Sequence, residues 1–148
     1  MSERRITFTL NRLVNALNAA ADRILREQFK LTFSQFQFLV VLDACGTIPS
    51  KTFAEQLGVS AAAVSKRLAW FEQRGLIQTG TIPRDRRTVT VTISKHGKDL
   101  LSQTSGVLEE SFRKGFADLQ SVNVDELNAT LLKVWDHLAH NESLEHHT

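Results

Sequence analysis

The sequence has little of what several classes of protein depend on. Its one cysteine, Cys45, excludes an internal disulfide and a cysteine-rich zinc site. No apolar run approaches the roughly 18 residues that a membrane-spanning helix needs, and no secretion signal follows the polar residues 1–5. A chain of 148 residues can still bury a core without disulfides or metal. These features predict a one-domain cytoplasmic protein with no membrane partner.

Catalytic groupings are missing as well. No nucleophile, base and orienting acid lie close together in the chain, and no glycine-rich loop is present that could hold a phosphate. The spacing of His96, His137 and His140 does not argue for a metal site. We therefore expect neither an enzyme nor a protein that depends on a metal or a cofactor.

Positive charge is concentrated in about a quarter of the chain. Residues 60–98 hold eight cations and two acids, a local charge of +6 in a chain whose net charge is +2. Such a block is typical of a surface that meets a polyanion, although a solvated basic face has the same composition. Charge alone leaves these two interpretations equal.

Hydrophobic periodicity predicts two helices at the start of the chain. The first runs from about Phe8 to Phe29. Thr32-Phe33-Ser34-Gln35 then has the Thr-x-x-Gln form of a capping box and begins a strongly apolar helix that ends at Gly46. Four aromatic residues gather here, and core packing is favoured for them over the lining of a ligand cleft: Phe29, Phe33, Phe36 and Phe38.

The next segment has the form of a helix-turn-helix. A short helix is expected near Lys51 to Leu57, started by Ser50 or by Thr52 with Glu55 as its capping partner. Gly58-Val59 turns the chain, and Ser60 can cap a second helix that stops at Gly75. The spacing of this second helix turns four residues inward: Ala61, Val64, Leu68 and Phe71.

A β-hairpin is predicted directly after these helices. Threonine alternates with valine or isoleucine from Thr88 to Ile93, which is typical of a half-buried strand. Leu76 to Ile82 is its expected antiparallel partner, and Pro83 to Arg87 forms the tip. A helix-turn-helix followed by a two-stranded hairpin is a winged helix.

Further helices flank this module. Ser94 begins one helical stretch, and Val124 to His140 forms another. Their apolar stripes, with that of the first helix, favour contact with a second subunit, and the alternative is a monomeric bundle. We expect a mainly α (α+β) fold with a dimerisation helix at 1–30, a winged helix-turn-helix lobe at 31–98, dimerisation helices at 99–141 and a flexible tail at 142–148. Within that tail, Leu144-Glu145-His146-His147 resembles an expression-tag junction.

The second helix of the pair has an outward face that suits a DNA groove. Helical geometry turns Ala62, Lys66, Ala69 and Gln73 outward, with Ser65 beside them. A small, polar face around one lysine can enter a major groove about 12 Å wide. Lys66 and Arg67 can reach guanine edges or phosphates, and Ser60 and Ser65 suit hydrogen bonds to phosphates or bases. Alanines alone would indicate only high helix propensity.

Three arginines at the hairpin tip suggest a second contact. Arg84, Arg86 and Arg87 repel one another in the free protein and gain energy when phosphates or a narrow minor groove supply the opposite charge. We expect Asp85 to order the loop by pairing with a neighbouring arginine. A merely solubilising turn is the alternative.

The order of the motifs resembles the MarR family. The residues that carry the resemblance are Leu31-Thr32-x-x-Gln35, Ala54-x-x-Leu57-Gly58-Val59-Ser60, Phe71-Glu72-Gln73-Arg74-Gly75-Leu76-Ile77, and Asp85-Arg86-Arg87 before the threonine-rich strand and Gly97. The resemblance covers about residues 31–101, and the flanking helices match in position and pattern only. Arg67 departs from the family pattern, because an apolar residue is frequent there.

The resemblance implies a homodimeric repressor with two winged-helix lobes on a palindromic site in double-stranded DNA. It implies recognition-helix contacts from Ala62, Ala63, Ser65 and Lys66 and wing contacts from Arg84, Arg86 and Arg87. It also implies release by a small phenolic or aromatic effector or by an oxidant, and no residue identifies which. Two alternatives stay open: an adaptor that binds a protein, and a redox sensor acting through Cys45, for which a buried structural cysteine is the favoured interpretation.

Overall fold

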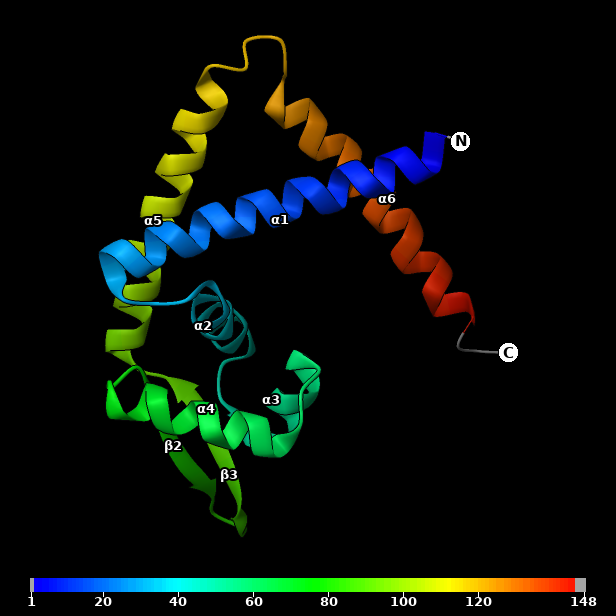
Figure 1. The fold of residues 1–148 in the computed structure, drawn as a ribbon. Helices are drawn as coiled ribbons and strands as arrows, with labels where there is room; N and C mark the ends of the chain where they lie inside the picture. Colours follow the sequence, from blue (N-terminus) through cyan, green and yellow to red (C-terminus); the bar gives the residue numbers. More distant parts are fainter. Residues whose placement is uncertain (1, 146–148) are drawn as a thin grey trace. The chain divides into compact units, whose positions relative to one another are not determined.

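The computed structural model describes the backbone of residues 2–145 and the side chains of residues 5–140. The elements run in the order α1 Ser2–Phe29, α2 Phe33–Cys45, β1 Ile48–Pro49, α3 Ser50–Leu57, α4 Ala61–Gln73, β2 Ile77–Ile82, β3 Asp85–Ile93, α5 Lys95–Ala117 and α6 Val124–Glu145 (Figure 1). The predicted fold class, mainly helical with a small sheet, is confirmed. Across the described residues, no helix is long and apolar enough to cross a membrane.

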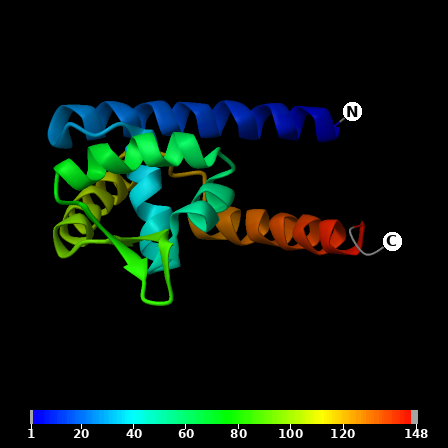
Figure 2. The same cartoon turned by 90° about the horizontal axis from the view of Figure 1, so that it is seen from below.

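The chain divides into two compact units, residues 1–108 and 109–148. The first unit contains α1, the helix-turn-helix and the hairpin. In Figure 2, as in Figure 1, the β2–β3 hairpin projects from this unit on the side away from α1. The boundary between the units falls within α5.

Helix α1 begins earlier than its apolar pattern predicts. Its C-terminal half packs into the first unit, where Ala21 and Leu25 are buried. Its N-terminal half leaves large apolar side chains exposed: Ile6, Phe8, Leu13 and Val14. Because exposed apolar surface of this extent is unusual on a monomer, this half of α1 is a candidate for contact with a partner.

The predicted start of α2 is confirmed, whereas neither predicted cap of α3 forms. Thr32 Oγ1 accepts from the Gln35 N–H at 3.0 Å, and Gln35 Oε1 accepts from the Thr32 N–H at 2.9 Å, which completes a capping box. Helix α3 instead has Pro49 as its N-cap, with no side-chain hydrogen bond. The caps expected at Ser50 and Thr52 were wrong because the helix begins at Ser50, directly after the strand that ends in Pro49.

The sheet has three antiparallel strands in the order β1-β3-β2. The hairpin was predicted, but β1 was not. Ile48 lies opposite Val91 and Pro49 opposite Thr90. A two-residue strand that ends in proline has no alternation to detect, and proline is tolerated there because β1 is an edge strand.

The core of the first unit is built around Phe38 of α2. Its ring stacks on Phe71 of α4 at a centroid distance of 4.1 Å and meets the edge of Phe53 of α3 at 4.7 Å. All three are almost fully buried, so Phe38 has the predicted core role. Phe29, Phe33 and Phe36 are only half-buried. The stack joins α2 directly to α4, so the direction of one helix constrains the other.

A close backbone approach joins the hairpin to α5. Ser94 begins the helix as predicted: its Oγ accepts from the Gly97 N–H at 3.0 Å and donates to the Gly75 carbonyl. A Cβ at Gly97 would lie 2.2 Å from the carbonyl oxygen of Leu76. Only glycine therefore fits at this position.

The second unit contains the end of α5 and all of α6. None of the described side chains of α6, residues 124–140, is buried. The exposed ones include large apolar groups: Leu127, Leu131, Val134, Trp135 and Leu138. Helix α6 continues to Glu145, into the segment expected to be a tail, whereas His146 and His147 lie outside the described residues.

Candidate nucleic-acid interface

Helix α4 begins and packs as its sequence predicts, with one exception. Ser60 is the N-cap, and its Oγ accepts from the Ala63 N–H at 3.1 Å. Val64, Leu68 and Phe71 are buried. Ala61 is exposed, so its predicted inward position was wrong, because the first turn of α4 extends past the buried cluster, whose first member on this helix is Val64.

The outward face of α4 is small and polar around one lysine. Ala62, Ser65, Lys66, Ala69 and Gln73 are all exposed, and Ala63 is half-buried at the edge of this face. No bulky side chain projects from the N-terminal half of the helix. The shape meets the steric requirement of a helix that enters a major groove.

Arg67 lies on one flank of α4, turned from this face toward the start of α2. Together with Trp70 it lines a pocket of about 470 Å³. The other lining residues are Thr32, Ser34, Gln35, Phe38, Ala63, Lys66 and Phe71. The Arg74 guanidinium lies over the Trp70 ring at 3.8 Å from its centroid. Trp70 was not predicted as a site residue, although its position three residues after Arg67 places both on one flank of α4.

The opposite flank of α4 contacts the hairpin. Thr79 Oγ1 of β2 donates to Glu72 Oε1 at 2.7 Å. This hydrogen bond, which no sequence pattern predicted, connects the end of α4 to the base of the hairpin. The base of the hairpin therefore lies against this flank of α4.

The hairpin tip is wider than its strand boundaries suggest. Thr81 pairs with Val89, but Ile82 pairs with Asp85, so Arg86, Arg87 and Thr88 form a bulge on β3. Arg84, Arg86 and Arg87 are exposed, and none has an ion pair within the described part of the chain. With three arginines and one acid, Asp85, the tip has a local charge of +2.

Asp85 orders this tip, but not through an arginine side chain as predicted. Its Oδ1 accepts from the Arg87 backbone N–H at 3.0 Å, and its Oδ2 accepts from Thr88 Oγ1 at 2.6 Å. The predicted guanidinium partner was wrong, since the two carboxylate oxygens instead accept from the backbone N–H and the hydroxyl of an Asx-type turn. The arginine side chains stay available to an external anion.

These hydrogen bonds make the tip sensitive to acid. The Thr88 hydroxyl and then the Arg87 N–H hold the pKa of Asp85 below its ordinary value of 3.8. A depressed folded-state pKa means that the contribution to stability is full above 3.8 and is lost as pH falls through the lower value. The amide shift of Arg87, followed by NMR, is expected to titrate with a midpoint below 3.8. A midpoint at or above that value would show that the carboxylate is not held in this way.

Cys45 and the histidines contribute no comparable arrangement. Cys45 is the last residue of α2 and is half-buried against the core cluster of the first unit. His96, His137 and His140 are exposed. Within residues 5–140, no group of three or more histidine, cysteine or acidic side chains could hold a metal ion.

Comparison with known proteins finds regulators of transcription among the similar sequences. The family model described as "MarR family" matches residues 31–89, the segment that contains α2, α3, α4 and the hairpin tip, and confirms the resemblance seen in the motifs. The chain is 28% identical over 137 residues to the HTH-type transcriptional regulator YwaE of Bacillus subtilis (strain 168), covering 90% of this chain and 78% of that protein.

Solved structures show the same fold. FabT of Streptococcus pneumoniae in complex with DNA is 19% identical with a TM-score of 0.71, over 96% of this chain and 99% of FabT. A mutant MarR from E. coli complexed with operator DNA is 24% identical with a TM-score of 0.63, over 85% of this chain and 93% of that one. Both of those proteins were solved with DNA.

Proposed function

The chain belongs to the MarR family through its residues 31–89, and from this premise we propose that it is a sequence-specific regulator of transcription that binds double-stranded DNA. One observation carries the proposal. The exposed face of α4, small around Lys66, is joined through the Glu72–Thr79 hydrogen bond to a hairpin whose tip has three exposed arginines without an ion pair among the described residues.

The residues of this surface take different roles. Ala62, Ala63, Ser65 and Lys66 enter the major groove, and Lys66 reads base edges. Arg84, Arg86 and Arg87 bind phosphates or an adjacent narrow minor groove, while Asp85 orders the tip between them. Ser60 and Arg67 contact the DNA backbone, because Arg67 lies about 100° around α4 from Lys66 and so flanks the exposed face.

The active form is a homodimer on a palindromic site. The exposed apolar side chains of the N-terminal half of α1 and of α6 supply the dimerisation surface. Two recognition helices about 34 to 36 Å apart then meet successive major grooves on one side of the duplex. Residues 1–30 and the helices after residue 98 form the dimerisation domain, and residues 31–98 form the DNA-binding lobe.

The protein acts as a steric repressor. The dimer occupies a promoter until a small phenolic or aromatic effector shifts the balance of its conformations. The pocket lined by Arg67 and Trp70 supports this, because it has aromatic walls, two cations and about 470 Å³ of volume.

Two substitutions test the assigned roles. Lys66→Ala is expected to weaken binding to the selected site about 5- to 100-fold, with little effect on random duplex, because it removes a base contact. Arg86→Ala is expected to weaken binding to the selected site and to random duplex. It should also make the slope of log affinity against log salt shallower by about one, because one phosphate contact is lost. Fluorescence anisotropy over a salt series measures both quantities.

The matched control is Arg23→Ala, which removes one exposed cation of α1 and should leave both affinities within about twofold. Equal losses on selected and random duplex for both variants would contradict the assignment. If the wild-type chain binds no duplex at low salt but binds an acidic protein, the adaptor alternative replaces this proposal.

A further inference from the structure

The connection between α1 and α2 is short and anchored. Only residues 30–32 separate the two helices. Lys30 has a φ of 56°, and the buried Leu31 donates its N–H to the Leu25 carbonyl at 3.2 Å. With so few residues between them, a single side-chain contact across the joint can fix the angle between the helices.

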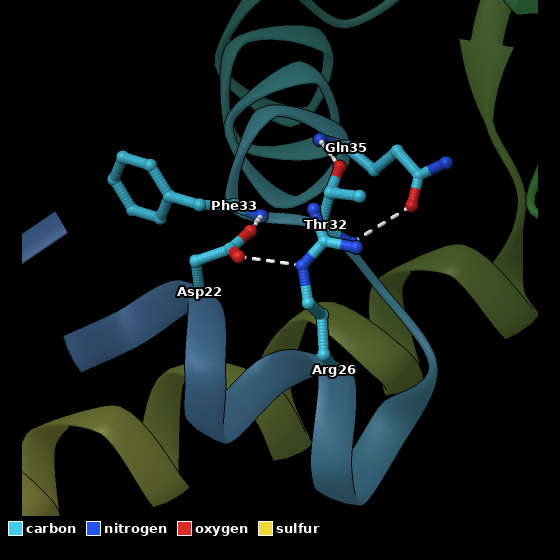
Figure 3. A network of polar contacts seen from close by, with 5 residues as sticks. All are labelled: Asp22, Arg26, Thr32, Phe33 and Gln35. Carbon is cyan, nitrogen blue, oxygen red and sulfur yellow. Dashed lines mark hydrogen bonds and ion pairs between the residues drawn. The ribbon is translucent and has the colours of Figure 1, made fainter. Parts of the chain in front are cut away.

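Asp22 makes that contact. The capping box of α2 satisfies the backbone N–H groups of Thr32 and Gln35, but not that of Phe33. The Phe33 N–H donates instead to Asp22 Oδ1 at 2.8 Å, from a carboxylate eleven positions earlier and in another helix (Figure 3). Asp22 Oδ2 accepts from Arg26 Nε at 2.5 Å. The carboxylate is thus held from both sides.

The charged state of Asp22 suits this role. The Phe33 N–H and then the Arg26 side chain hold the pKa of Asp22 below its ordinary value. A charged acceptor makes a stronger hydrogen bond than a neutral one, and the first turn of a helix favours negative charge. The bond between α1 and α2 is therefore present at physiological pH.

We propose that Asp22 is a positioning residue that fixes the angle between α1 and α2 and thereby sets the half-site spacing that the dimer accepts. The proposal rests on the proposed function, in which α1 lies in the dimer interface. Helix α2 transmits the angle, because Phe38 stacks on Phe71 of the recognition helix at 4.1 Å. Loosening the joint lets each lobe rotate on α1, so the distance between the two recognition helices is no longer restricted to one value.

The experiment compares spacing preference, which a merely stabilising helix cap would not change. Wild-type full-length protein first selects an inverted repeat from a random-sequence duplex library. Duplexes are then made with the selected spacing and with one or two base pairs inserted or deleted, each displacing a half-site by about 3.4 Å along the axis. Anisotropy gives the affinity for each duplex, and a duplex with one half-site gives the intrinsic affinity of a lobe.

Asp22→Ala is expected to reduce the preference for the selected spacing from about tenfold or more to under about threefold, with single half-site affinity within about twofold of wild type. Asp22→Asn keeps an acceptor for the Phe33 N–H and should retain most of the preference. Arg26→Ala keeps the Asp22–Phe33 bond and should do the same. Glu27→Ala is the matched control, because it removes an exposed acid from the same helix.

A second variant removes the donor instead of the acceptor. Phe33 is the first residue of α2, where proline is tolerated, and the extended Thr32 before it is compatible with a following proline. Phe33→Pro deletes the N–H and should match Asp22→Ala, while Phe33→Ala removes only the ring and should retain the preference.

The two proposals fail in distinguishable ways. If the wild-type protein selects no inverted repeat, the proposed function fails. If the wild-type protein selects an inverted repeat while Asp22→Ala and Phe33→Pro keep its spacing preference, the role of Asp22 is overturned. That result would hold whatever the melting temperatures of the two variants. Loss of preference in Glu27→Ala to the same extent would also overturn it.

Discussion

Replacing Gly97 with alanine is expected to lower the free energy of unfolding by about 2 to 4 kcal/mol. Helix propensity alone would predict the opposite, because it favours alanine over glycine by about 1 kcal/mol. The added Cβ would lie 2.2 Å from the Leu76 carbonyl oxygen and 2.8 Å from Ile93 Cγ1. Leu76 lies at the base of the hairpin, and its oxygen also accepts from the Ser94 N–H at 3.0 Å. Relief of the clash must therefore move backbone. Urea unfolding followed by circular dichroism measures the loss.

Gly106 in the same helix is the matched control. A Cβ there would meet nothing within 4 Å, so Gly106→Ala should stabilise the protein by about 0.5 to 1 kcal/mol. If the free energy of unfolding falls in Gly97→Ala and rises in Gly106→Ala, the close approach at Gly97 is established. The same sign and size at both positions would mean that α5 does not begin against the Leu76 backbone.

The double variant Leu131→Asp, Leu138→Asp is expected to convert the proposed dimer to a monomer. Both side chains lie on the apolar face of α6, where Leu131 is 37% and Leu138 55% exposed. Neither belongs to the buried core, so the monomer should stay folded. Affinity for an inverted repeat should fall at least about 100-fold, because each lobe then binds its half-site independently. Analytical ultracentrifugation gives the mass, and anisotropy gives the affinity.

Ala129→Asp is the control for this variant. Ala129 is also exposed on α6, but at 100° per residue it lies on the opposite side of the helix from Leu131 and Leu138. It should leave both the dimer and the affinity intact. A double variant that remains dimeric and binds the repeat like wild type would place the dimer interface elsewhere.

Local patterns predicted most of the winged helix because the residues that begin or end its elements lie within those elements or next to them. The capping box at Thr32, the cap at Ser60 and the threonine alternation before Ser94 each depend on residues within a few positions of one another, and all three were found. Helix spacing also predicted that Lys66 faces outward. Such signals are short-range, so the sequence alone contains them.

The missed features depend on contacts between distant segments. Strand β1 exists only because Ile48 meets Val91, and Asp22 acts on a backbone N–H eleven positions away. Helix spacing predicts the direction of Arg67 around α4. It does not predict that Arg67 faces the start of α2, because the position of α2 next to α4 depends on the packing of Phe38 against Phe71. For Asp85 the prediction named the wrong type of donor. Its carboxylate accepts from the Arg87 backbone N–H and the Thr88 hydroxyl, and not from an arginine side chain.

We propose that this chain is a dimeric, sequence-specific binder of duplex DNA. Fluorescence anisotropy of the purified protein against genomic duplex fragments tests this, with competition to recover any preferred site and a salt titration. We expect enrichment of an inverted repeat, with log affinity falling steeply as log salt rises. Absence of binding at low salt, or binding with no enriched sequence, would contradict it.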